Sequence, residues 1–99
     1  MKYLLIRKPR LGAERPTAQT IRAHKDYVLS KLKDGVADCV YAFVGGGGCS
    51  ILNADSPEKL NEQIFSGPMA RFYEYEIHPL SDYASFMEAV AQGVERQGR

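Results

Sequence analysis

Hydrophobic and polar positions along the chain follow two spacings, and the changes between them mark the expected elements. Residues 72–77 alternate large apolar or aromatic side chains with Glu74 and Glu76, which is the period of a strand. Leu60 and Ile64 instead fall at the spacing of a helix. The whole pattern predicts strands at 2–8, 36–44, 49–54 and 71–78, and helices at 17–33, 56–66 and 83–92.

Capping and turn residues support these boundaries. Residues 55–58, Asp-Ser-Pro-Glu, combine a capping side chain, a proline in the first turn and an acid near the positive helix end. Gly67 and Pro68 end that helix. The four glycines at 45–48 are predicted to form a hairpin turn, because no Lys-Ser/Thr follows them as a phosphate loop would require. Residues 94–99 are predicted to be a frayed tail.

The order of these elements predicts the fold class. Each half of the chain reads as strand, helix, strand, which is typical of an α+β, ferredoxin-like βαββαβ antiparallel sheet, here with an extra C-terminal helix. The chain of 99 residues is expected to form one domain, 1–99. The extra helix carries an apolar face that packs either on its own subunit or on a partner: Tyr83, Phe86, Met87 and Val90.

The second strand is apolar on both faces, which bears on assembly. Simple alternation places Val36, Val40, Ala42 and Val44 on one face and Ala37, Cys39, Tyr41 and Phe43 on the other. A strand buried on both sides needs cover on both sides, and helices can cover only one face of a ferredoxin-like sheet. We therefore predict that a second copy covers the other face, giving a homodimeric α/β barrel or a higher oligomer.

Composition and charge narrow the possible partners. The chain has 13 basic and 12 acidic residues and a net charge of +1, which predicts no nucleic-acid partner and no bulk attraction to anionic lipid. No apolar run approaches the ~20 residues that span a bilayer. Residues 3–6 are too few for a signal-peptide core, and the basic residues of 7–10 follow at once. We therefore expect a cytoplasmic protein without a membrane partner.

The two cysteines are predicted to be free thiols. A hairpin turn centred on Gly46 and Gly47 would set Cys49 opposite Val44. Cys39 would then lie about five residues further along the strand, or roughly 17 Å away at the rise of a strand. That separation is too large for a disulfide bridge.

The segment 44–80 resembles the C-terminal half of muconolactone isomerase-like proteins, in the dimeric α/β barrel group. The shared features are a glycine at the hairpin, the Ser-Ile-hydrophobic run of 50–56, Glu58 and Leu60 on the helix, the Gly-Pro pair at 67–68, and an aromatic-rich strand ending in Glu76-Ile77-x-Pro79-Leu80. The resemblance implies the fold, while the group's reactions vary: isomerases, cyclases, cofactor-free monooxygenases, haem enzymes and proteins without known activity.

The resemblance also implies chemistry on the first helix. Isomerases of this kind move a proton on an unsaturated lactone without metal or organic cofactor, through an acid–base residue on that helix. Here Arg22, His24, Lys25 and Asp26 occupy the region where those isomerases carry an acidic pattern, which argues against muconolactone itself as the substrate.

Helical spacing selects the catalytic candidates from that helix. Ile21, Val28 and Leu32 define its expected buried stripe, with His24 on one shoulder and Lys25 within it. We predict His24, Lys25 and Asp26 as catalytic residues, with His24 kept neutral as a base needs to be. The alternative is that His24 is a boundary residue and that Lys25 extends to solvent.

The remaining predictions concern the pocket and the reaction. We expect a pocket lined by Arg7, Tyr41, Phe43, Phe65, Arg71 and Phe72, in which arginine binds a carboxylate. No metal site is predicted, because His78 has no ligand spacing to His24, and no cofactor is expected. The predicted function is a small-molecule binding protein or a cofactor-free isomerase or cyclase acting on a small unsaturated or aromatic acid or lactone. The alternatives are a cofactor-free monooxygenase of the same fold and a non-catalytic binding or assembly subunit.

Overall fold

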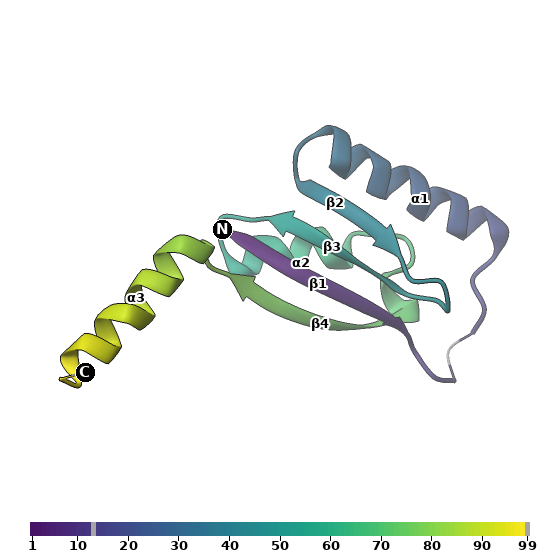
Figure 1. Ribbon diagram of the computed structural model, residues 1–99. Helices are drawn as coiled ribbons and strands as arrows, with labels where there is room; N and C mark the ends of the chain where they lie inside the picture. The colour runs from purple at the N-terminus through teal and green to yellow at the C-terminus, as the bar shows by residue number, and fades with distance from the viewer. Residues whose placement is uncertain (13, 99) are drawn as a thin grey trace.

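A four-stranded sheet forms one layer of the molecule, and two helices lie on one of its faces (Figure 1). The computed structural model describes residues 1–12 and 14–98. In chain order the elements are β1 (Lys2–Pro9), α1 (Ala18–Lys33), β2 (Ala37–Ala42), β3 (Gly48–Asn53), α2 (Pro57–Phe65), the short 3-10 helix η1 (Ala70–Phe72), β4 (Tyr73–Leu80) and α3 (Tyr83–Arg96).

The strands are arranged in the order β2-β3-β1-β4, and each neighbouring pair is antiparallel. This arrangement confirms the predicted α+β, ferredoxin-like fold with an extra C-terminal helix. The sheet of one chain is open at its two edge strands, so a single chain is not a closed barrel. A barrel would require the sheet of a second copy.

Side-chain caps begin the three α-helices where the sequence predicts. Thr17 accepts a hydrogen bond from the main-chain N–H of Thr20 at 3.1 Å, and Ser56 accepts one from Lys59 at 3.2 Å. Asp82 caps α3, whose C-terminal half differs from the prediction. The helix continues through Arg96 instead of fraying from residue 94. Residue 99, the last of the predicted tail, lies outside the described residues.

Alternate residues of the strands form a buried face, which we call the helix-covered face, because α1 and α2 lie over it. Its hydrophobic core is built by β1, β2, β3, the residue after β3, and α2, whereas α1 and β4 add only the partly buried Leu32 and Tyr75. Ile21 of α1 is 46% exposed, so it does not belong to a buried stripe as predicted. The core consists of Tyr3, Leu5, Ala37, Leu52, Ala54, Leu60 and Ile64.

A β-bulge corrects the predicted faces of the second strand. The register with β3 shifts between Ala37 and Cys39, so that Ala37 and Val40 both face the helices. Simple alternation had placed Ala37 with Cys39. The extra residue is Asp38, whose carboxylate accepts hydrogen bonds from Lys2 and Asn53 on the opposite face. These long-range partners stabilise a bulge that the local pattern does not predict.

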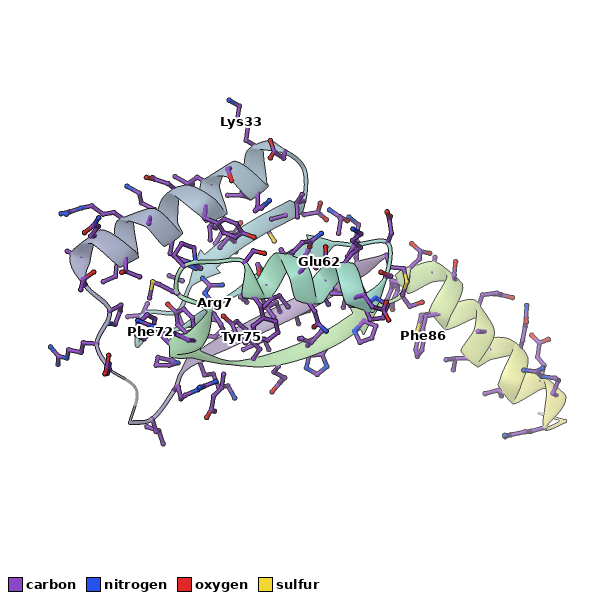
Figure 2. The ribbon with its side chains drawn as sticks, turned by 180° about the vertical axis from the view of Figure 1, so that it is seen from behind. Arg7, Lys33, Glu62, Phe72, Tyr75 and Phe86 are labelled. Carbon is purple, nitrogen blue, oxygen red and sulfur yellow. The ribbon has the colours of Figure 1, made fainter. Side chains whose placement is uncertain are left out.

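The opposite side of the sheet, which we call the open face, has no helix over it within residues 1–12 and 14–98 (Figures 1 and 2). Both cysteines lie there and are free, as predicted, but their register is not the predicted one. Cys49 pairs with Tyr41 and Cys39 pairs with Ile51, because the turn begins after Ala42. The apolar part of the open face consists of Leu4, Ile6, Cys39, Tyr41, Cys49 and Ile51.

The third helix extends away from the sheet and its two covering helices (Figure 1). None of its residues is buried, and the apolar side chain of Tyr83 is 76% exposed. Within residues 1–12 and 14–98, no helix is both long enough and apolar enough to cross a membrane.

Candidate ligand-binding site

A cavity of about 60 Å³ lies between the helix-covered face and the two helices above it. Its walls come from four strands and two helices, so the whole βαββαβ unit shapes it. Seven apolar side chains form most of the surface: Leu5, Val28, Val36, Ala37, Val40, Leu52 and Ile64. Seven polar or aromatic side chains complete it: Arg7, His24, Tyr27, Lys31, Ser50, Gln63 and Tyr75.

Arg7 enters the cavity from the middle of the sheet (Figure 2). Its Nη2 donates a hydrogen bond to the main-chain carbonyl of Tyr41 at 3.1 Å, which fixes one side of the guanidinium. Gly48 lies opposite Arg7 in the register of β1 and β3. A Cβ at Gly48 would collide with the guanidinium and with the Tyr41 carbonyl, so this glycine leaves the space that Arg7 occupies.

His24 reaches the cavity from α1. Its Nδ1 accepts a hydrogen bond from the main-chain N–H of Met69 at 3.3 Å. The aromatic rings of Tyr27 and Tyr73 lie 6.3 and 6.4 Å from the imidazole, measured between ring centroids. Burial, and secondly the positive charge of Arg7, lower the pKa of His24 below 6.5. The imidazole is therefore neutral at physiological pH.

The two tyrosines of the cavity serve as hydrogen-bond donors. The hydroxyl of Tyr27 donates to the main-chain carbonyl of Gln63 at 2.7 Å, and that of Tyr75 donates to Ala70 at 3.1 Å. Burial raises the pKa of both hydroxyls. Each phenol therefore stays protonated, and neither is suited to remove a proton from a ligand.

Gln63 carries a buried hydrogen-bond acceptor in the cavity wall. Its Nε2 donates to the main-chain carbonyl of Asn53 at 3.1 Å, which fixes the orientation of the amide. Its Oε1 is buried and has no partner among the described residues. A buried acceptor without a donor is unfavourable, so the hydrogen bonding of Gln63 is incomplete within the described residues.

The charges around the cavity favour an anion. Arg7 and Lys31 line it, and the Nζ of Lys31 lies 5.0 Å from the centre of the Tyr27 ring. Among the described residues that line the cavity, none is an aspartate or a glutamate. An apolar cavity with two cations and a neutral imidazole fits a small acid or an enolate.

The structure brings only two of the predicted site residues together, Arg7 and His24. Lys25 and Asp26 lie on the solvent side of α1, with side chains 63% and 73% exposed and 3.8 Å between Nζ and Oδ1. The helix is rotated from the predicted stripe because Tyr27 and Lys31, rather than Ile21, share the inward side with His24. The catalytic roles of Lys25 and Asp26 stay predictions.

The other five predicted pocket residues do not line this cavity. Tyr41 lies on the open face and is 66% exposed, and Phe43 is exposed just beyond β2. Phe65 is exposed on α2, where its ring meets Tyr75 edge to face. Arg71 covers the ring of Phe72, which is buried in η1.

Sequence reasoning missed several lining residues: Tyr27, Lys31, Ser50, Gln63 and Tyr75. A signal for two of them was present, because Tyr27 and Lys31 follow His24 at the i+3 and i+7 spacing of a helix face. Ser50 and Gln63 become visible only when the strands and α2 are placed.

Comparison with known proteins bears on the fold. No family model matches this chain, and neither does any curated protein. The crystal structure of muconolactone isomerase at 3.3 Å resolution superimposes with a TM-score of 0.73 and 16% sequence identity, over 84% of this chain and 91% of that one. The chain has a muconolactone isomerase-like fold. This confirms the resemblance seen in residues 44–80.

A second muconolactone isomerase-like structure supports the same conclusion. It is the 5-chloro-2-hydroxyhydroquinone dehydrochlorinase of Burkholderia phenoliruptrix in complex with 2,5-dihydroxybenzoquinone. The TM-score is 0.70 at 19% identity, and the match covers 86% of this chain and 98% of the other. Structural neighbours of this fold are thus enzymes that act on small molecules. At these identities the likeness establishes the fold and leaves the reaction open.

Proposed function

We propose that this protein is a cofactor-free isomerase or cyclase that acts on a small unsaturated or aromatic acid, lactone or hydroxyquinone. One observation carries the proposal: Arg7 and a neutral His24 reach the same apolar cavity from different elements. The apolar walls would hold the ring of the ligand, and Arg7 would bind its carboxylate or enolate oxygen. The muconolactone in the name of one similar protein and the 2,5-dihydroxybenzoquinone bound to the other are compact, oxygen-rich rings of this kind.

The size of the cavity limits the ligand. About 60 Å³ holds a few water-sized groups, which is less than a whole aromatic ring needs. The ligand is therefore a single ring at most, with part of it extending out of the cavity. Arg7 and Lys31 favour negative charge on that ligand.

We further propose that the functional unit is a homodimer assembled through the open face. The apolar part of that face is flanked by polar side chains of β4, including Glu76 and His78, which are joined by a 2.7 Å hydrogen bond. An apolar centre with a polar rim is typical of protein–protein interfaces. A second copy offers the same surface and would close the two sheets into a barrel.

A non-catalytic binding protein is the second candidate. It is favoured by the absence of any carboxylate among the described cavity-lining residues and by the raised pKa values of Tyr27 and Tyr75. Such a cavity can bind an anion whether or not His24 accepts a proton. Binding without turnover would identify this case.

The test uses the full chain with muconolactone and 2,5-dihydroxybenzoquinone as probes. We expect at least one probe to bind by calorimetry, and Arg7→Met to weaken its affinity by about tenfold or more, because a charge-assisted hydrogen bond is lost. Lys8→Met is the matched control: Lys8 is the next residue, lies on the open face and should have no effect.

Two readouts separate the reaction classes. Product formation from a bound lactone without oxygen uptake supports an isomerase or cyclase. Oxygen consumption with a hydroquinone of the same ring would instead identify a monooxygenase. If neither probe binds, or if Lys8→Met weakens binding as much as Arg7→Met, the proposed site is wrong.

A further inference from the structure

We propose that His24 acts in the cavity as a neutral hydrogen-bond donor through Nε2–H, and that Met69 and Gly67 are the positioning residues that hold it in this form. This deepens the proposed function, and it rests on that function only for the ligand that the donor would meet. The arrangement of the imidazole follows from contacts within the chain.

The hydrogen bond from Met69 determines which ring nitrogen carries the proton. A main-chain N–H can only donate, so the Nδ1 that receives it at 3.3 Å must offer a lone pair. In a neutral imidazole the other nitrogen is then protonated. His24 lines the cavity, so Nε2–H is the polar group that it has left for a ligand.

Gly67 makes room for this arrangement. It is buried between α2 and η1, and its main-chain carbonyl accepts a hydrogen bond from Ala70 at 3.1 Å. A Cβ at Gly67 would lie 3.0 Å from Cε1 and 3.2 Å from Nδ1 of His24. The φ of Gly67 is outside the left-handed region, so the backbone alone does not require glycine. The requirement is space for the imidazole ring.

The surroundings of His24 keep it from accepting a second proton. Arg7 of β1 contributes a positive charge, while Tyr27 of α1 and Tyr73 of β4 contribute aromatic rings. With Nδ1 occupied and Nε2 protonated, no lone pair remains for a proton from the ligand. In this arrangement His24 is a donor, which is an alternative to its predicted role as a base.

A neutral N–H in a half-buried site stabilises negative charge that develops on oxygen. Neutral histidines polarise carbonyl groups in this way, without transferring a proton. The group that His24 would contact is thus a carbonyl or enolate oxygen, on a ligand whose other oxygen is bound by Arg7.

The first experiment requires no ligand. In the full chain labelled with ¹⁵N, two-bond ¹H–¹⁵N correlation spectra distinguish the two tautomers of each imidazole. We expect a single Nε2–H form for His24 at neutral pH, assigned by comparison with His78→Gln. A protonated Nδ1, or an average of both forms, would overturn the proposal.

The role of Gly67 is tested by Gly67→Ala against Gly93→Ala. The control position on α3 has open space around its Cβ site, so its His24 signals should match those of the unaltered chain. In Gly67→Ala we expect a mixture of tautomers and a higher His24 pKa, because the bond from Met69 is lost. Unchanged His24 signals in that variant would remove Gly67 from the mechanism.

A second pair of variants tests the donor itself and does not depend on Gly67→Ala folding. Gln at position 24 can place an N–H near the site of Nε2, whereas Asn keeps an acceptor near the site of Nδ1. With 2,5-dihydroxybenzoquinone we expect His24→Gln to retain most of the affinity and His24→Asn to lose about tenfold. The opposite order would overturn the donor role. If the unaltered chain binds no probe, the proposed function fails. The tautomer spectrum still tests whether the proton of His24 lies on Nε2.

Discussion

The two faces of the sheet are built from alternate residues of the same strands, yet only one of them is covered within a chain. On the helix-covered face, Tyr3 and Leu5 of β1 are 3% and 6% exposed. Their neighbours Leu4 and Ile6 point to the open face and are only partly buried. The strands present apolar side chains on both faces, but helices pack over only one of them. Strand composition therefore indicates how much cover a sheet needs, and a single chain supplies half of it.

The difference also separates chemistry from assembly. The helix-covered face has the cavity, with Arg7 and His24 directed into it. The open face carries an apolar centre, and its ion pairs, such as Lys8 with Glu76, lie at exposed positions. Exposed ion pairs contribute little to stability, so these pairs add little to the fold.

The largest expected effect comes from the helix-covered face. Leu5→Ala should lower the free energy of unfolding by about 2–5 kcal/mol, because it leaves a cavity in the core. Urea unfolding followed by circular dichroism measures this change. Leu11→Ala is the control, since Leu11 is 95% exposed, and it should change stability by less than about 0.5 kcal/mol. Equal effects of the two substitutions would show that this face is not the core.

The next effect tests the open face. Tyr41→Asp should raise the dissociation constant of the dimer by about 100-fold or more, because a charge without a partner would be buried between the sheets. Sedimentation should give a dimer for the unaltered chain and for Tyr41→Phe, and a folded monomer for Tyr41→Asp. Val40→Asp, on the other face, should unfold the chain instead. A monomeric unaltered chain would contradict the proposed dimer.

A smaller effect concerns the two thiols. Cys39 and Cys49 lie on the open face, so a second copy would shield both of them. In the native protein we expect a thiol reagent to label both cysteines slowly. In Tyr41→Asp the labelling rate should rise in proportion to the fraction of the protein that is monomeric. Equal rates in the two proteins would place the cysteines outside the interface.

These two faces also show what the sequence can and cannot predict. The caps at Thr17 and Ser56 are local signals, and the elements begin where those residues predict. The bulge at Asp38 depends on Lys2 and Asn53, which come from other strands, so alternation alone misassigns Ala37. Local patterns determine the elements, and contacts between elements determine how each is rotated.

In the candidate site, too, local patterns predict a residue's element, and contacts between elements determine its neighbours. His24 was predicted from its place on α1, and its neighbours in the cavity were mostly missed, because α1 buries no residue that would fix its rotation. The spaces left by Gly48 and Gly67 exist only once Arg7 and His24 lie beside them. In the sequence, these glycines look like ordinary turn residues.

The smallest expected effect is the pH dependence of stability, and it distinguishes the two faces through one residue of each. The pKa of His24 in the folded chain is lowered from 6.5 by burial and by Arg7. Below 6.5 the unfolded chain therefore binds a proton that the folded chain does not, so the free energy of unfolding falls as the pH drops below 6.5 toward the folded pKa. His24→Gln should remove this fall.

On the open face, the hydrogen bond from His78 lowers the pKa of Glu76 from 4.5. The contribution of Glu76 to the free energy of unfolding is therefore lost only at more acidic pH, below 4.5. Urea unfolding at a series of pH values should give two separate declines. His24→Gln should abolish the first, and Glu76→Gln should reduce the second, to which Asp38 and Asp82 also contribute because hydrogen bonds lower their pKa values. A first decline that persists in His24→Gln would mean that His24 is not held neutral on the helix-covered face.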